Sequence, residues 1–153
     1  MCAANAGDVI AWLNAPFAQK ADRVAVLGAN GDQASHLQVS DMGIVAIGLR
    51  EFTSFGNTYW CVTVGLKNFS SSTDSYNLFE FKLLTPSGRI DGATYPLIND
   101  ASSLLSSGEL ASNGSANGQV CYDAPSAQTG RFAVVYEPIS FTSDSRALFY
   151  FDH

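Results

Sequence analysis

Residues 59–67 read YWCVTVGLK, and this stretch decides the fold class. Its even positions carry Trp, Val, Val and Leu, whereas its odd positions carry Tyr, Cys, Thr, Gly and Lys. Side chains of a β-strand point to opposite faces at alternate residues, so a period of two marks a strand with one buried face. The stretch therefore predicts a strand whose even residues face a core.

Similar alternation recurs along the chain and is punctuated by turn residues. Turn signals stand at Asn30-Gly31, Thr85-Pro86-Ser87-Gly88, Asn113-Gly114 and Asn117-Gly118. The further strands predicted are 37–39, 43–52, 76–84, 108–110, 119–124, 131–137 and 147–151. The run 43–52 is either one bent strand or two strands, with Gly43 and Gly48 at bends. The segment 95–105 is either a short strand or an irregular crossover. This number of short strands is typical of an all-β, two-sheet sandwich.

The alternation also assigns a core face. We expect the following side chains to be buried there: Trp60, Val62, Val64, Leu66, Phe79, Phe81, Leu83, Val120, Tyr122, Phe132, Val134 and Tyr136.

Size and charge limit the classes of protein and partner. A chain of 153 residues with 46% hydrophobic residues suits one globular domain. The net charge of -6 disfavours nucleic acid and anionic lipid surfaces as partners. No apolar stretch approaches the roughly 20 residues needed to span a bilayer.

The first 30 residues differ from the rest. Val9, Ile10, Leu13 and Phe17 fall on one face of a short helix, which Pro16 disturbs near its end. We therefore divide the chain into an N-terminal extension at 1–30, with this short helix, and a sandwich domain at 31–153.

Five motifs carry a family resemblance over roughly 32–151. They are a strand ending in Lys-Asn (62–68), Phe81-Lys82-Leu83 before the turn residue Gly88, a Gly-Glu-Leu segment with a glycine-rich turn (108–114), Gly-x-Val-x-Tyr-x-x-Pro (118–125), and Val-Val-Tyr-x-Pro (134–138). The chain thus resembles the bacterial extracellular immunoglobulin-like (telokin-like) lipoprotein domain of unknown function. It is also similar in layout to the mycobacterial immunoprotective secreted antigen.

The resemblance implies an immunoglobulin-like antiparallel sandwich in the cell envelope or outside the cell. Its motifs are turns and core positions, and the family offers no catalytic residue to carry over.

In an immunoglobulin-like strand order, Cys61 and Cys121 lie on neighbouring antiparallel strands. Both fall between core residues and point to the outer face. Directly facing side chains of such strands are close enough for a disulfide. We expect a bond between them in an oxidising compartment. The alternative is two unrelated, half-buried thiols.

Cys2 is left over. Its place after Met1, followed by Ala3 and Ala4, suits the lipid-modified first residue of a mature lipoprotein whose targeting segment has been removed. A chance cysteine in a terminal segment is the alternative reading.

The residues offer little for catalysis, metals or cofactors. The histidines are His36 and His153, and the second stands last, where we expect a frayed chain. His36 with Asp32, Asp41 or Asp100 has no recognised ligand spacing, so a solvated histidine is the simpler reading. No nucleophile, phosphate or dinucleotide motif is present. We expect no enzyme activity, no metal and no cofactor.

Three function classes remain. The first is an envelope-anchored or secreted binding or adhesion module for a protein or cell-wall partner, with Phe52, Phe55, Tyr59 and Phe69 as candidate contacts at loop edges. The second is a structural or self-association domain of a surface lipoprotein. The third is a hydrolase with an unrecognised site.

Overall fold

The computed structural model describes residues 22–29, 35–96, 104–123, 127–138 and 146–153, of which 22–29 and 35–36 are described by backbone alone. The strands are β1 (Asp22–Ala29), β2 (Ser35–Val39), β3 (Met42–Ser54), β4 (Asn57–Asn68), β5 (Asp74–Tyr76), β6 (Phe81–Leu84), β7 (Ile90–Thr94), β8 (Gly108–Leu110), β9 (Ser115–Tyr122), β10 (Arg131–Tyr136) and β11 (Arg146–Asp152). A 3-10 helix, η2 (Leu78–Glu80), precedes β6.

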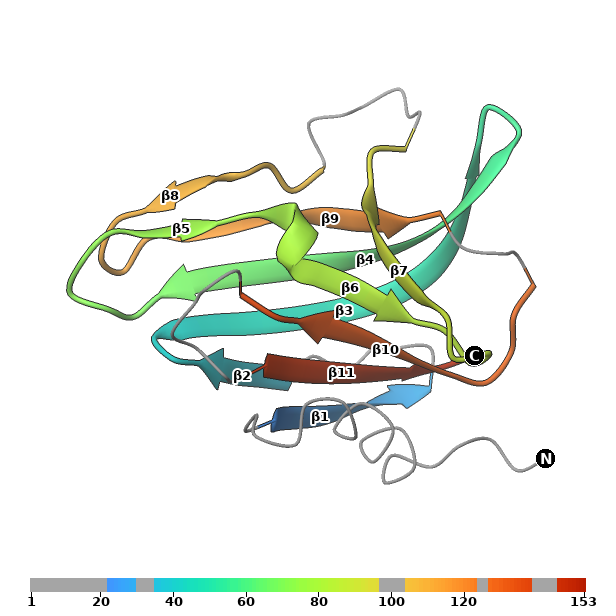
Figure 1. Cartoon of the computed structure of the whole chain (residues 1–153), viewed down its shortest axis with the longest axis horizontal. Helices are drawn as coiled ribbons and strands as arrows, with labels where there is room; N and C mark the ends of the chain where they lie inside the picture. Colours follow the sequence, from blue (N-terminus) through green and yellow to red (C-terminus); the bar gives the residue numbers. More distant parts are fainter. Residues whose placement is uncertain (1–21, 30–34, 97–103, 124–126, 139–145) are drawn as a thin grey trace.

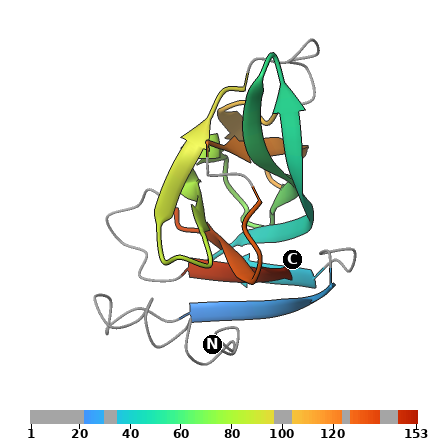
Figure 2. The same cartoon turned by 90° about the vertical axis from the view of Figure 1, so that its right-hand side faces the viewer.

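The strands wrap two layers around one interior (Figures 1 and 2). Hydrogen bonds connect them in the order β1-β11-β10-β6-β7-β9-β4-β3-β2, and β5 pairs with β8 in a small separate ladder. β7 joins the layers because its first part, from Ile90 to Gly92, pairs with β6 and its end, Ala93 and Thr94, pairs with β9. All pairs between these strands are antiparallel except β1 with β11. The predicted immunoglobulin-like antiparallel sandwich is confirmed.

The interior is filled by alternate side chains of both layers. Every predicted core residue is buried except Phe79, which is 46% exposed. The even-numbered face of β4 is the buried one, as the alternation predicted.

Phe79 is a wrong prediction because 76–84 is not one strand. Asn77 accepts a hydrogen bond from the N–H of Phe79, and Glu80 accepts one from the N–H of Asn77. This capping box winds η2, which turns Leu78 inward and Phe79 outward before β6 begins.

The run 43–52 belongs to one strand, and only one of its two glycines bends it. The register of β3 against β4 shifts between Ile47 and Arg50, and Gly48 has a φ of 70°, which a glycine adopts without strain. Gly43 instead provides room for the ring of Phe69, which a Cβ would meet at 2.5 Å.

The predicted turn at Asn117-Gly118 is also wrong. Both residues lie inside β9 and pair with Gly65 and Val64 of β4. A Cβ on Gly118 would lie 2.6 Å from the backbone nitrogen of Leu105. The glycine therefore permits a close backbone approach instead of a turn.

At the N-terminal side, Asp22–Ala29 forms β1, a strand that the sequence pattern did not predict. The predicted helix at 9–17 and Cys2 lie outside the described residues. In the segment 95–105, for which the sequence left a strand or a crossover open, Leu104 forms a parallel bridge to Gln119, and the N–H of Leu105 donates a hydrogen bond to the carbonyl oxygen of the same residue.

Candidate functional site

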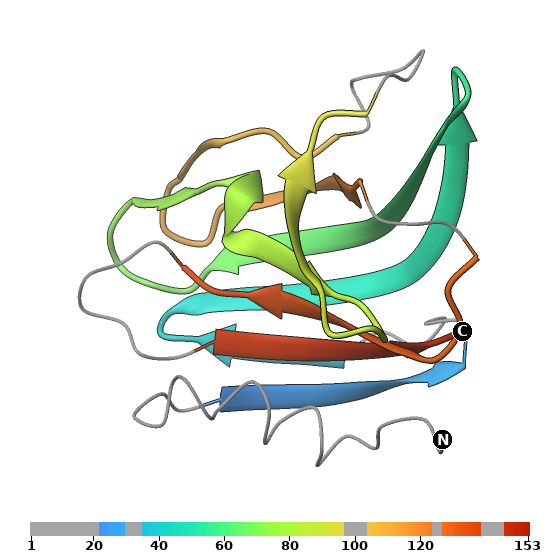
Figure 3. The ribbon, with the colours of Figure 1, turned by 45° about the vertical axis from the view of Figure 1, so that its right-hand side comes forward.

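The β3–β4 hairpin is the most prominent feature of the surface. Its strands pair from Met42 and Asn68 to Ser54 and Asn57. Beyond the bulge at Gly48, its far half bends away from the rest of the sheet and ends in a free-standing turn (Figure 3).

Phe55 occupies the tip of this hairpin. Phe55 and Gly56 form the two-residue turn with φ angles of 49° and 78°. Such primed turns favour asparagine or glycine at the first position, because other residues are strained at positive φ. Phe55 is nevertheless 68% exposed, the highest value among the large hydrophobic residues that the structure describes.

A cavity of about 430 Å³ lies on the outer face of the hairpin. It is lined by Ile47, Gly48, Arg50, Glu51, Phe52, Cys61, Thr63 and Gln119. Arg50 and Glu51 give this wall one cation and one anion. A carboxylate oxygen of Glu51 accepts a hydrogen bond from the N–H of Ala127 at 3.2 Å.

The four candidate aromatic residues do not form one patch. Phe52 and Phe55 are exposed on the hairpin, and Phe69 is exposed at the opposite end of β4. Tyr59 is buried and packs with the two cysteines. Three of the four therefore lie in the far half of the hairpin, where Phe52 stands opposite Tyr59, and Phe69 lies apart from them.

Phe69 belongs to a second hollow, an apolar groove of about 530 Å³ on the outer face of the same layer. Its ring lies over Gly43, and the Nζ atom of Lys67 lies 5.2 Å from the ring centroid. Gly65 deepens the floor, since a Cβ there would meet Val45 at 2.9 Å.

Cys61 and Cys121 form a disulfide, as predicted. They face each other directly across β4 and β9 with a Cα–Cα distance of 4.1 Å. Both lie on the outer face, but neither is freely exposed, because Tyr59 and Leu104 pack against them. The outer face is thus covered at this point.

Asn68 explains the Lys-Asn motif. This fully buried side chain donates from Nδ2 to the carbonyl oxygens of Ser72 at 2.7 Å and Leu110 at 3.0 Å, and accepts from the N–H of Ser70 at 2.9 Å. It fixes the loop after β4 to the end of β8. The motif is structural.

Within the described ranges no group of three potential metal ligands occurs. The side chain of His36 is not among the described ones. Asp32 and Asp100 lie outside these ranges. His153 is not frayed: its ring packs edge-on against Trp60 at 5.1 Å and Phe132 at 5.6 Å between centroids, and its backbone pairs with Gly130.

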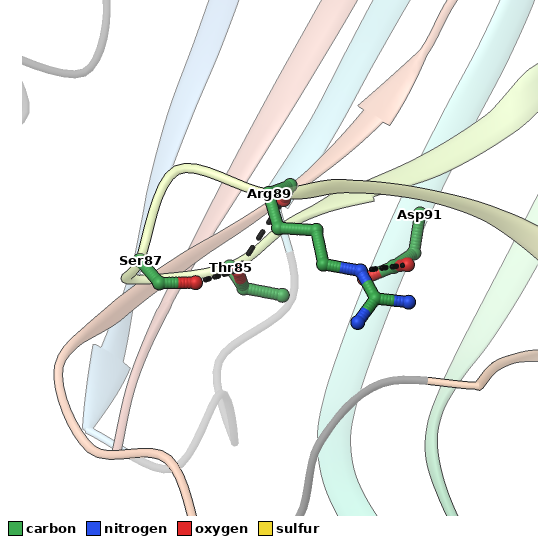
Figure 4. A network of polar contacts seen from close by, with 4 residues as sticks. All are labelled: Thr85, Ser87, Arg89 and Asp91. Carbon is green, nitrogen blue, oxygen red and sulfur yellow. Dashed lines mark hydrogen bonds and ion pairs between the residues drawn. The ribbon is translucent and has the colours of Figure 1, made fainter.

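Two ion pairs outside the hairpin, Arg89–Asp91 and Arg131–Asp152, stabilise the framework. Figure 4 shows the turn between β6 and β7, where Thr85 contacts Ser87 and Arg89, and Arg89 binds Asp91 at 2.8 Å. Arg131 forms two hydrogen bonds with Asp152, which raise the pKa of its guanidinium. No described helix is long and apolar enough to cross a membrane.

Sequence reasoning missed a second exposed aromatic pair. Phe79 and Tyr95 meet edge-on with centroids 6.0 Å apart, and both are exposed. The signal was the Asn77-x-x-Glu80 capping box, which marks a turn and so reverses the assignment of Phe79 to the core.

Comparison with known proteins adds the family. The YjhA protein of Bacillus subtilis superposes with a TM-score of 0.64 at 15% identity, over 77% of this chain and 97% of that chain. YcdA of the same species, described as a candidate lipoprotein, superposes with a TM-score of 0.63 at 16% identity. The match covers 78% of this chain but only 39% of YcdA. MPT63, a secreted protein of Mycobacterium tuberculosis, gives 0.55 at 11% identity over 87% and 98%.

Identities this low show a shared fold, and they confirm the resemblance drawn from the motifs. A search among curated proteins finds no significant match. The sequence model of one family does match, over residues 31–146, which is most of the chain. The protein therefore belongs to the family described as Domain of unknown function (DUF4352).

Proposed function

We propose that this protein is an exported, non-catalytic binding module that contacts its partner through the tip of the β3–β4 hairpin. The observation that carries the proposal is Phe55, a large apolar residue held exposed and at positive φ at the end of a projecting arm.

Phe55 costs the isolated domain free energy in two independent ways. A non-glycine residue in the left-handed region costs about 1–2 kcal/mol. Exposure forgoes the roughly 1.5–3 kcal/mol that burial of a phenylalanine side chain provides. Asparagine at this position would reduce the first cost and remove the second. A partner that buries the ring accounts for a phenylalanine here.

Two further observations support export. A disulfide such as Cys61–Cys121 persists in oxidising compartments and is rare in the cytosol. Similar folds occur in a secreted protein and in a candidate lipoprotein. The acidic charge of the chain agrees with a protein or cell-wall partner in preference to nucleic acid.

Binding of the purified, labelled protein to cell-envelope fragments of its source organism tests the proposal. The variant Phe55→Asn should lose about tenfold or more in affinity, the range of a central aromatic contact. Its free energy of unfolding should stay equal or rise, because asparagine suits the turn. The matched control is Phe79→Ala, another exposed phenylalanine, which should bind as the unmodified protein does. Equal binding by Phe55→Asn and the unmodified protein would refute this role of the hairpin.

Self-association is the second candidate, because the apolar groove around Phe69 lies on the same layer as the exposed Phe55. Sedimentation velocity over a range of concentrations separates the two functions. A dimer or larger species that Phe55→Asn abolishes would identify a second copy as the partner. A protein that stays monomeric at all concentrations would exclude self-association and favour a different molecule as the partner.

A further inference from the structure

The two sulfur atoms of the disulfide have different surroundings. Cys61 is 8% exposed and lines the cavity of the hairpin, whereas Cys121 is 1% exposed and lines neither this cavity nor the groove around Phe69. Leu104, which bridges to β9, packs against the cluster that holds Cys121. A reagent in solvent therefore meets Cys61 first.

The order of residues across the sheet favours the same sulfur. Arg50, Cys61, Cys121 and Thr94 stand in one row across β3, β4, β9 and β7. A thiolate displaces one sulfur by approaching from the side remote from the other. For Cys61 that side lies above β3, where the cavity is lined by Gly48 and by the side chain of Arg50, whose Nε lies 3.7 Å from the position that a Cβ on Gly48 would take. For Cys121 it lies toward β7.

The cavity also holds a cation suited to a thiolate. Arg50 lies directly opposite Cys61 in the register, and both line the same wall. The other groups around Cys61 are Glu51 on the cavity wall, whose carboxylate is engaged by Ala127, and the phenol of Tyr59. Thr63 and Gln119 are neutral. A positive charge beside a sulfur favours its ionised form.

We propose that Cys61 is a site of thiol–disulfide exchange with an external dithiol. The thiolate of the dithiol attacks Sγ of Cys61, a mixed disulfide forms, and the electron pair of the broken bond passes to the sulfur of Cys121, which takes up a proton. The second thiol of the dithiol then attacks the dithiol sulfur that is bonded to Cys61. An internal disulfide of the dithiol forms, and Cys61 leaves as a thiolate that takes up a proton. The dithiol is oxidised by two electrons and the protein disulfide is reduced by two.

Two matched variants test the preference for Cys61. Cys2→Ser/Cys121→Ser keeps only the Cys61 thiol, Cys2→Ser/Cys61→Ser keeps only the Cys121 thiol, and both lack the disulfide. Folded protein reacts with 5,5'-dithiobis(2-nitrobenzoate), and the released thiolate is followed by absorbance. Cys61 should react about tenfold or more faster than Cys121. Equal rates, or a faster Cys121, would overturn the proposal.

The disulfide-bonded protein provides a second measurement that needs no variant. Dithiothreitol without denaturant should open the bond while the far-ultraviolet circular dichroism of the sheet persists. If the bond opens only once denaturant unfolds the sheet, Cys61 is not an exchange site.

A pH profile separates a chemical role of Arg50 from a structural one. In the protein that keeps only Cys61, Arg50→Gln should shift the rise of the reaction rate to higher pH, and the two rates should converge in strong alkali, where both thiols are ionised. Arg89→Gln, a distant exposed arginine, should leave the profile unchanged. An unshifted profile in Arg50→Gln removes Arg50 from the proposal as a positioning residue.

Discussion

Tyr122 carries a hydroxyl group into the middle of an apolar core. Its side chain is fully buried among residues of both layers, and among the described residues its hydroxyl oxygen has no hydrogen-bond partner. Burial raises the pKa of the phenol above its usual value, because the charged form is poorly solvated there. The residue is thus a local weakness of the core.

Replacing Tyr122 with phenylalanine should raise the free energy of unfolding by about 1 kcal/mol, since a buried polar group without a partner is removed. Chemical denaturation at neutral pH measures the change. Tyr95→Phe, at an exposed tyrosine, serves as the control and should change little. A loss of stability in Tyr122→Phe would show that the hydroxyl has a partner.

The same residue predicts a dependence on alkali. The pKa of Tyr122 is higher in the folded chain than in the unfolded chain, where it is about 10. Ionisation of Tyr122 therefore leaves the free energy of unfolding unchanged below a pH of about 10 and lowers it as the pH rises further, because the folded chain holds the proton more tightly than the unfolded chain. Tyr122→Phe should lose less stability above that pH than the unmodified protein. Parallel curves of the two proteins would contradict this assignment.

β4 is the element that the sequence predicted best. From Trp60 to Leu66 its even-numbered residues are apolar and buried, so the period of two is clear in the sequence. η2 was missed because a single 3-10 turn is too short to show a period of its own. β1 was missed because it follows the predicted helix, and because its partner β11 comes much later in the chain.

Asn68 at the end of β4 gives an element-scale prediction. The variant Asn68→Asp keeps the size and the acceptor toward Ser70, but it removes the donor that serves Ser72 and Leu110. It should cost about 2–4 kcal/mol, because buried carbonyl groups lose their partner and a charge is buried. Asn57→Asp at the exposed start of β4 is the matched control. Urea denaturation of the pair measures the difference, and equal stabilities would count against the role of Asn68.

At the scale of the whole molecule, the disulfide joins residues separated by 60 positions. Closing a loop of that length reduces the entropy of the unfolded chain, and the chain-entropy model predicts a stabilisation of about 4 kcal/mol. Replacing both Cys61 and Cys121 with serine should lower the melting temperature markedly. Calorimetry of the variant and of the unmodified protein measures this. An unchanged melting temperature would show that the bond contributes nothing net.

This pairing was predictable only in part. Strand phase placed both sulfurs on the outer face, but their proximity required the strand order, which came from the family resemblance. The covering by Leu104 was not predictable, because its segment has no regular pattern. The candidate aromatic contacts stay predictions. Their separation was not predictable for a related reason: strand ends can be read from sequence, whereas the end of the molecule at which each residue lies follows from the fold.

The last strand has a consequence for how the chain is made. β11 pairs with both β1 and β10, and it brings residue 146 opposite residue 22. Contacts between such distant parts of a sequence form slowly, and the edge of the sheet has no partner until β11 has been synthesised. A growing chain therefore leaves the ribosome with β1 still unpaired in this sheet. This late pairing suits the export proposed above, because a chain that has not yet folded can pass through a narrow translocation channel.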